Sequence, residues 1–263
     1  MQKISLLLLF SLVLSSCEKI IDVDLNTANP ITVVDAALCS QDDEHTIILS
    51  TTGRFTDGEG LSFIENATVS IDDGNGQTAT FTEGFPGIYT LQNYALNTGL
   101  SYNLTVMNGE ETITAISEIV PQIAIDSIYF EEGFFGTPEG EPIDYNVRLI
   151  FQDPAGTDNY YRVLVTVNDT LQKRTLVTND NITDGQLRDL NFNGSDIYEG
   201  DTVMVELWTI DKAGYDYYST LQDISSGGGF SSSTPYNPIT NLSSGLGHFT
   251  VYQRFRRTVV VAL

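Results

Sequence analysis

Short runs in which apolar and polar residues alternate recur along most of the chain, and glycine, asparagine, aspartate and proline separate them. Runs rich in valine, isoleucine, threonine, tyrosine and phenylalanine are typical of half-buried β-strands. The clearest pair, Ala67–Ile71 and residues 77–81, flanks an aspartate- and glycine-rich turn and predicts a β-hairpin. In the first half of the chain, such runs predict strands at Ile31–Cys39, Thr46–Thr52, Ala67–Ile71, Thr78–Thr82, Gly87–Leu91, Tyr102–Met107 and Thr112–Ile119.

The second half continues this pattern and adds one helix. Tyr217, Tyr218, Leu221 and Ile224 recur at helical spacing, and consecutive glycines at residues 227–229 predict where the helix ends. Strands are predicted at Asp126–Phe130, Ile143–Gln152, Tyr160–Asn168, Leu171–Thr178, Leu187–Phe192 and Thr202–Ile210, with one or two more over Phe249–Leu263. The chain is therefore predicted to be all-β with one short helix.

The spacing of these strands predicts two β-sandwich domains. Several short strands before Pro121 suggest a small sandwich of immunoglobulin or transthyretin type. The rhythm of Gly87–Leu91 and Gly99–Tyr102 resembles that of prealbumin-like carboxypeptidase-regulatory domains. Because Pro121 precedes a new strand, we predict an N-terminal sandwich over residues 30–121 and a C-terminal β-rich domain over residues 122–263.

The N-terminus carries a targeting signal. An apolar run, Ile4–Leu14, follows a basic start, and it is too short for a membrane-spanning helix but typical of a secretory signal peptide. Residues 14–17 read Leu-Ser-Ser-Cys and resemble the bacterial lipobox, whose cysteine is acylated on sulfur and becomes the new N-terminus. We therefore predict a signal peptide over residues 1–16, lipid attachment at Cys17, and an anchor and tether over residues 17–29.

The chain is strongly and unevenly acidic. It contains 12 lysines and arginines against 35 aspartates and glutamates, a formal net charge of −23. Residues 20–147 hold one basic residue against 21 acidic ones, whereas residues 148–263 hold nine against 13. Because nucleic acids and anionic lipid headgroups both require a positive protein surface, no nucleic-acid partner is expected. Membrane attachment therefore has to rest on the lipid at Cys17.

Several sequence pieces, taken in order, resemble one family. They are Glu18–Leu25 after the lipobox, Ile64–Val69 and Gly87–Tyr89 around the hairpin, Ile125–Ile128, Phe151–Pro154, Asn159–Arg162 and Pro235–Phe249. Together they resemble the Bacteroidota lipoproteins called domain of unknown function 4249, over nearly the whole mature chain. His248 departs from the pattern, where an aromatic residue such as tyrosine is expected. The resemblance implies an outer-membrane lipoprotein, often encoded beside a TonB-dependent receptor, and it implies no known activity.

A segment near the C-terminus is the main candidate for a structural or binding loop. Its prolines restrict the backbone, its asparagines favour Asx turns, and its glycines permit positive φ or close backbone approach. These residues are Pro235, Asn237, Pro238, Asn241, Gly245, Gly247 and Phe249. They suit an irregular loop fixed on the sandwich, with Leu242, Leu246 and Phe249 buried. The alternative is a binding loop displayed at the sandwich end.

Motifs for catalysis, cofactors and metals are scarce. His45 and His248 lie far apart and outside any recognisable motif, so we predict no catalytic residues, no cofactor and no metal site. The turn at residues 72–76 could hold calcium weakly, but a hairpin turn accounts for the same residues. Cys39 lies in an apolar run and is predicted to be a buried, unreactive thiol.

These observations lead to one principal hypothesis and two alternatives. We expect a non-enzymatic outer-membrane lipoprotein that serves as an accessory or binding component of a TonB-dependent uptake system. The first alternative is a structural or adhesive cell-envelope protein, in which an edge strand pairs with a partner. The second is a glycoside hydrolase or other hydrolase, which would require a buried pair of carboxylates in a pocket. The sequence names no small-molecule ligand.

Overall fold

The computed structural model describes residues 29–53, 62–133, 142–193, 196–225 and 236–262. The strands before Pro121 are β1 (Thr32–Cys39), β2 (Glu44–Thr51), β3 (Ser62–Phe63), β4 (Thr68–Asp72), β5 (Thr78–Thr80), β6 (Thr82–Phe85), β7 (Ile88–Gln92), β8 (Ser101–Asn108) and β9 (Glu111–Glu118). Those after it are β10 (Ser127–Glu132), β11 (Tyr145–Gln152), β12 (Tyr160–Val167), β13 (Thr170–Leu171), β14 (Leu176–Asn179), β15 (Leu187–Phe192), β16 (Thr202–Ile210) and β17 (Leu246–Val260). Helix α2 (Lys212–Ser225) lies between β16 and β17.

The predicted β-rich class with a helix is confirmed, and so are several local elements. The hairpin of β4 and β5 forms around the aspartate-rich turn, where Asp72 and Asp73 accept hydrogen bonds from the backbone N–H groups of Gly74 and Asn75. The run predicted over Leu171–Thr178 instead divides into two short strands, β13 and β14, which both pair with β12. Among the described residues, no helix is long and apolar enough to span a membrane.

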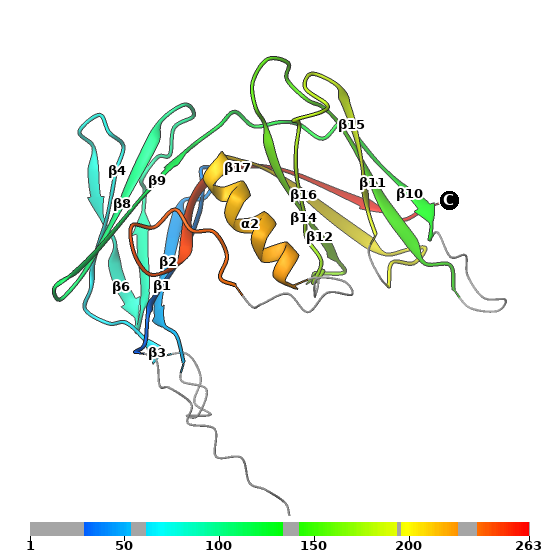
Figure 1. Cartoon of the computed structure of the whole chain (residues 1–263). Helices are drawn as coiled ribbons and strands as arrows, with labels where there is room; N and C mark the ends of the chain where they lie inside the picture. Colours follow the sequence, from blue (N-terminus) through cyan, green and yellow to red (C-terminus); the bar gives the residue numbers. More distant parts are fainter. Residues whose placement is uncertain (1–28, 54–61, 134–141, 194–195, 226–235, 263) are drawn as a thin grey trace, which may run out of the picture.

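One large sheet runs through the whole molecule (Figure 1). The strand order is β13-β12-β16-β17-β1-β2-β7-β6. In addition, β14 pairs with β12 and β3 pairs with β2. The four-stranded sheet β5-β4-β8-β9 covers its first half, and the three-stranded sheet β10-β11-β15 covers its second half. The protein therefore consists of two sandwich units that share one sheet.

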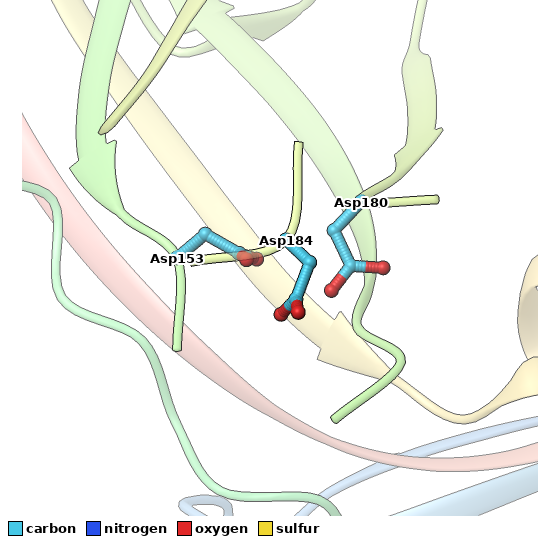
Figure 2. Close-up of side chains that lie close together, drawn as sticks. All are labelled: Asp153, Asp180 and Asp184. Carbon is cyan, nitrogen blue, oxygen red and sulfur yellow. The ribbon is translucent and has the colours of Figure 1, made fainter. Parts of the chain in front are cut away.

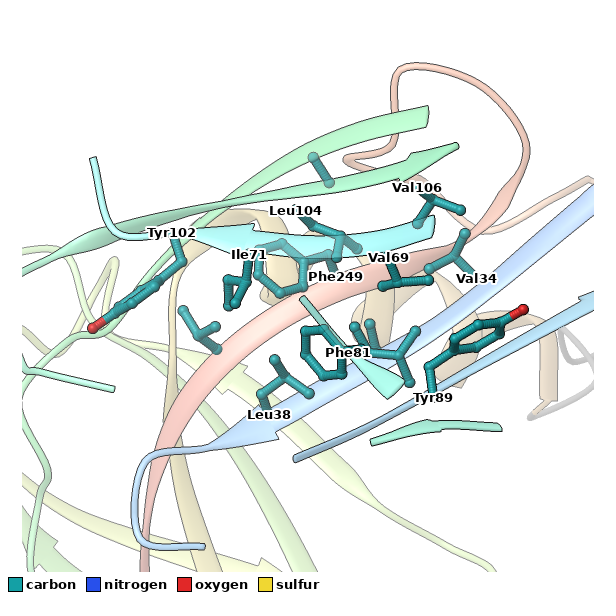
Figure 3. Packing of buried hydrophobic residues seen from close by; sticks show 14 of the residues in the cluster. Val34, Leu38, Val69, Ile71, Phe81, Tyr89, Tyr102, Leu104, Val106 and Phe249 are labelled. Atoms are coloured by element: carbon teal, nitrogen blue, oxygen red, sulfur yellow. The ribbon is translucent and has the colours of Figure 1, made fainter. Parts of the chain in front are cut away.

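Alternating residues fill the first core between two sheets (Figure 3). Val69 and Leu104, from β4 and β8, face Val34 and Phe249, from β1 and β17, and all four are fully buried. This period of two is what a strand with one buried face requires. The second core is built in the same way, and Val147 of β11 belongs to it together with Val163 and Val205 of the large sheet.

Strand β17 belongs to both units. Its first part pairs in parallel with β1, so that Val34 lies opposite Gly247, and its second part pairs antiparallel with β16, so that Leu207 lies opposite Phe255. We expected residues 122–263 to form a separate domain, but β17 places part of that range in the core of the first unit. The physical reason is length, since a strand of 15 residues reaches about 50 Å and spans two cores.

Candidate functional site

The segment leading into β17 is held by the side chain of Asn241. Its Nδ2 donates to the carbonyl oxygens of Ile116 (3.0 Å) and Phe249 (2.7 Å), while its Oδ1 accepts the backbone N–H of Phe249 (3.0 Å). The Thr240 hydroxyl donates to the carbonyl of Gly247 at 2.7 Å. Asn241 thus satisfies backbone groups on both β9 and β17, which fixes the place where β17 begins.

Two glycines of this segment touch the backbone of β1. Both have positive φ, and a Cβ atom would lie 2.7 Å from the Thr32 carbonyl oxygen at Gly245 and 2.0 Å from the Val34 carbonyl oxygen at Gly247. No side chain fits at such distances, so these glycines allow β17 to lie against β1.

The remaining residues of the predicted loop differ in how deeply they are buried. Phe249 is fully buried in the first core and Leu242 is buried beside it, whereas Asn237 is exposed and Pro238 and Leu246 are half-buried. Cys17 and Pro235 lie outside the described residues. From Thr240 onward the contacts are those of a structural connection, and a binding role for the segment stays a prediction.

A cluster of aromatic side chains fills the space between α2 and the large sheet. Trp208 stacks on Tyr252 with ring centroids 3.8 Å apart, and the Arg162 guanidinium lies over the rings of Tyr218 (3.9 Å) and Trp208 (4.7 Å). Cys39 belongs to this cluster and is 1% exposed, which confirms its predicted burial, and burial raises the pKa of its thiol. Trp208 lies on β16, which is a central strand because it pairs with both β12 and β17.

His248 lies at the edge of this cluster and is 4% exposed. Its ring stacks on Tyr217 at 4.1 Å, its Nε2 lies 2.7 Å from the Tyr218 hydroxyl, and its Nδ1 lies 4.0 Å from the Asp35 carboxylate. Burial, followed by the positive charge of Arg162, lowers the pKa of His248 to about 3. The imidazole is therefore neutral at physiological pH and serves as an aromatic packing residue, in the position where the family resemblance leads one to expect tyrosine.

The side-chain arrangement that the sequence did not predict is a cluster of three aspartates (Figure 2). Asp153 follows β11, Asp180 follows β14, and Asp184 precedes β15. One carboxylate oxygen from each lies within 4.8 Å of the other two, and Asp153 and Asp180 are each 1% exposed. Because these residues come from two separate loops, no spacing in the sequence links them.

Backbone and side-chain donors hold two of the three carboxylates. Asp153 accepts hydrogen bonds from the Tyr161 hydroxyl and from the Gly185 backbone N–H (2.8 Å), and Asp184 accepts the Gly156 N–H (2.7 Å). Both oxygens of Asp153 are therefore engaged, which is unsuited to a free nucleophile. The turn glycines at 156 and 185 were the available sequence signal, because each stands in an aspartate-containing turn.

The surface hollows found among the described residues lie elsewhere. One is lined by Lys173, Arg174 and Gln222, and another by Gln41, Asp42 and Tyr94. The acidic side chains at residues 72 and 73 are occupied by turn hydrogen bonds, as the hairpin interpretation predicts. The aspartate cluster is thus an oxygen-donor set between two loops and belongs to neither of these hollows.

Comparison with solved structures gives distant likenesses. A cytokine receptor complex is 10% identical over 88% of this chain and 97% of that chain, with a TM-score of 0.27. The FN1–FN3 domains of chicken CNTN1 are 9% identical over 70% and 63%, with a TM-score of 0.26. A two-domain fibronectin type III segment of chicken tenascin is 13% identical over 69% and 91%, with a TM-score of 0.21.

Comparison with curated proteins yields no match. The model of one family, by contrast, matches residues 18–258, and it is described as a domain of unknown function, DUF4249. This range covers nearly all of the described sandwich units, including most of β17. With that extent of match, the chain belongs to the DUF4249 family.

Proposed function

We propose that this protein is a non-enzymatic, lipid-anchored accessory protein of the outer membrane that serves a TonB-dependent uptake system through a binding surface. The observation that carries the proposal is the shared sheet. Since β17 crosses from one unit to the other, the two sandwiches form one rigid body rather than two domains joined by a flexible linker. A stiff body on a lipid tether suits a component that presents a surface to a membrane partner.

The positions of the chain ends support this arrangement. β1 begins near β3 at one end of the molecule, and β17 ends near β10 at the far end (Figure 1). A lipid at Cys17 would attach the first unit, which is also the more acidic one, next to the membrane. Repulsion between its carboxylates and anionic headgroups keeps the body off the lipid surface and leaves the second unit free to meet a partner.

A pair of cysteine variants tests the anchoring step. Cys17→Ala should move the protein from the membrane fraction to the soluble fraction, because no basic surface replaces the lipid. Cys39→Ala is the matched control: it removes a buried thiol and should leave the protein in the membrane fraction. Membrane retention of Cys17→Ala would contradict lipid anchoring.

Co-purification tests the partner. After extraction of cells in mild detergent, tagged wild-type protein should bring down a TonB-dependent receptor identified by mass spectrometry. Recovery of free monomer alone would argue against the uptake role. The neighbouring gene supplies a second check, since a receptor gene beside this one supports the proposal.

One observation favours the structural or adhesive alternative. β6 is the last strand of the large sheet, and the side chain of Phe85 on it is 72% exposed. Phe63 of the neighbouring short strand β3 is 48% exposed. Unpaired edge strands with exposed apolar residues readily pair with another chain. A deletion strain with normal growth on all nutrients but altered envelope integrity or biofilm would favour this alternative.

A further inference from the structure

The side chain of Asp180 is buried in this aspartate cluster. Asp180 is 1% exposed, and no hydrogen bond or ion pair reaches its side-chain oxygens from any residue that the structure describes. One of these oxygens points at Asp153 and Asp184, within 4.8 Å of an oxygen of each (Figure 2). Burying a carboxylate without a compensating group is unfavourable, so this arrangement favours a bound cation.

Two further features of the same turns agree with a bound cation. The hydroxyl oxygen of Thr183, which lies between Asp180 and Asp184 in sequence, is also buried without a hydrogen-bond partner. Arg188 is the nearby buried cation, but its guanidinium donates to the Asn179 carbonyl (2.8 Å) and the Thr178 hydroxyl (3.1 Å). Within the described part of the chain, no lysine, arginine or histidine forms an ion pair with the three aspartates.

We propose that Asp153, Asp180 and Asp184 bind a calcium ion. The donor set consists of hard oxygen atoms from irregular loops, which is the chemistry that Ca²⁺ prefers. Calcium–oxygen distances of about 2.3–2.6 Å place ligand oxygens up to about 5 Å apart, which accommodates the observed cluster. Three carboxylates on one ion favour Ca²⁺ over Mg²⁺, because Mg²⁺ usually retains water and takes one or two carboxylates.

The ion joins the two sheets of the second unit. Asp153 continues β11 of the three-stranded sheet, whereas Asp180 continues β14, which pairs with β12 of the large sheet. A calcium ion between them fastens the β11–β12 loop to the β14–β15 turn at one end of the sandwich. Calcium therefore stabilises the unit that, under the uptake proposal, meets the partner, although the site itself does not depend on that proposal.

Calcium titration of the purified whole chain tests the site. Isothermal titration calorimetry up to about 10 mM CaCl₂ covers the range of weak extracellular calcium modules. We expect saturable binding of one ion and a higher melting temperature in CaCl₂ than in EDTA, because an ion that binds only the folded state stabilises it. MgCl₂ at the same concentration should give a clearly smaller shift.

Asparagine variants separate the site from general charge effects. Asp180→Asn and Asp184→Asn should each abolish the calcium-dependent shift, and Asp180→Asn should melt higher than wild type in EDTA because it removes a buried charge. Asp184 is exposed, so Asp184→Asn remains informative if Asp180→Asn does not fold. Asp158→Asn, an exposed change in the same loop, is the matched control and should keep the full shift.

Three results would overturn the proposal. The first is that folded wild-type protein shows neither binding heat nor a change in melting temperature up to 10 mM Ca²⁺. The second is that Mg²⁺ raises the melting temperature as much as Ca²⁺ does. The third is that Asp184→Asn retains the wild-type response to calcium.

Discussion

The side chain of Asp211 links the two units through Ser117: its Oδ2 accepts the Ser117 hydroxyl at 2.7 Å, at the end of β9. The same carboxylate accepts the Glu118 N–H (2.9 Å), and its Oδ1 accepts the Gly214 N–H (2.8 Å) in the first turn of α2. The Ser117 oxygen in turn accepts the N–H of Val251 on β17 at 3.0 Å. Three elements, β9, α2 and β17, therefore meet at one pair of side chains.

Replacing Asp211 should weaken this junction. Asp211→Ala removes the cap of α2 together with the hydrogen bonds to β9, and we expect the free energy of unfolding to fall by about 2–3 kcal/mol. Urea denaturation followed by circular dichroism measures the change. Asp216→Ala is the control, because its ion pair with Lys212 is a surface pair on the same helix and should contribute less than about 1 kcal/mol. Equal losses in both variants would contradict a special role for Asp211.

Replacing Gly247 should prevent β17 from lying against β1. Gly247→Ala combines positive φ with a Cβ 2.0 Å from the Val34 carbonyl oxygen, so we expect a loss of at least about 3 kcal/mol or no soluble folded protein. Gly200→Ala isolates the backbone strain, because Gly200 also has positive φ but has open space around it, and should lose about 1–2 kcal/mol. The soluble yield and urea midpoint give the comparison, and similar stability of the two variants would refute the close-approach explanation.

Removing the amide of Asn241 should loosen the start of β17. Asn241→Ala leaves backbone groups of Ile116 and Phe249 without their partners, and we expect a loss of about 2–4 kcal/mol. Asn237→Ala changes an exposed residue of the same segment and should alter stability by less than about 0.5 kcal/mol. Hydrogen exchange at the Phe249 amide provides a local readout. Unchanged protection of this amide in Asn241→Ala would contradict the role of Asn241 in holding the start of β17.

His248 should make the protein less stable as the pH falls below neutrality. Its folded-state pKa of about 3 lies below the ordinary value of 6.5, so between these values the unfolded chain binds the proton and the folded chain does not. This contribution to stability is complete above pH 6.5 and decreases as the pH falls, by at most about 1.4 kcal/mol per pH unit. Urea midpoints between pH 7.5 and 5.5 measure the slope.

Two variants assign this slope to His248. His248→Gln keeps a polar side chain but cannot titrate, so its stability should depend less on pH over the same range. Asp35→Asn should keep the wild-type slope, since burial and Arg162, rather than Asp35, lower the pKa of His248. Equal slopes in wild type and His248→Gln would show that other groups cause the pH dependence.

Local patterns predicted the elements whose signals are local. The β4–β5 hairpin follows from a turn sequence between two alternating runs. The helix was placed by the apolar stripe from Tyr217 to Ile224, but its start at Lys212 was missed. The carboxylate of Asp211 caps this start by accepting the Gly214 N–H, whereas its hydrogen bonds to β9 depend on the tertiary structure.

In the candidate sites, too, the residue types were predictable from the sequence but their contact partners were not. Asn241 and Gly247 were selected as loop residues from their type, yet their partners on β9 and β1 lie far away in sequence. The aspartate cluster was missed because three strands, β12, β13 and β14, separate Asp153 from Asp180 in the sequence. Acidic residues are so abundant in this chain that their number alone gives no signal.

The β-rich class, the burial of Cys39, the hairpin and the family resemblance follow from the amino-acid sequence, because each depends on neighbouring residues or on residue order. Three features become apparent only in the folded chain: β17 joins two sandwiches, Asp211 contacts Ser117, and three aspartates from two loops converge. Pairing between distant strands depends on which surfaces can be buried together, and no local period encodes that choice.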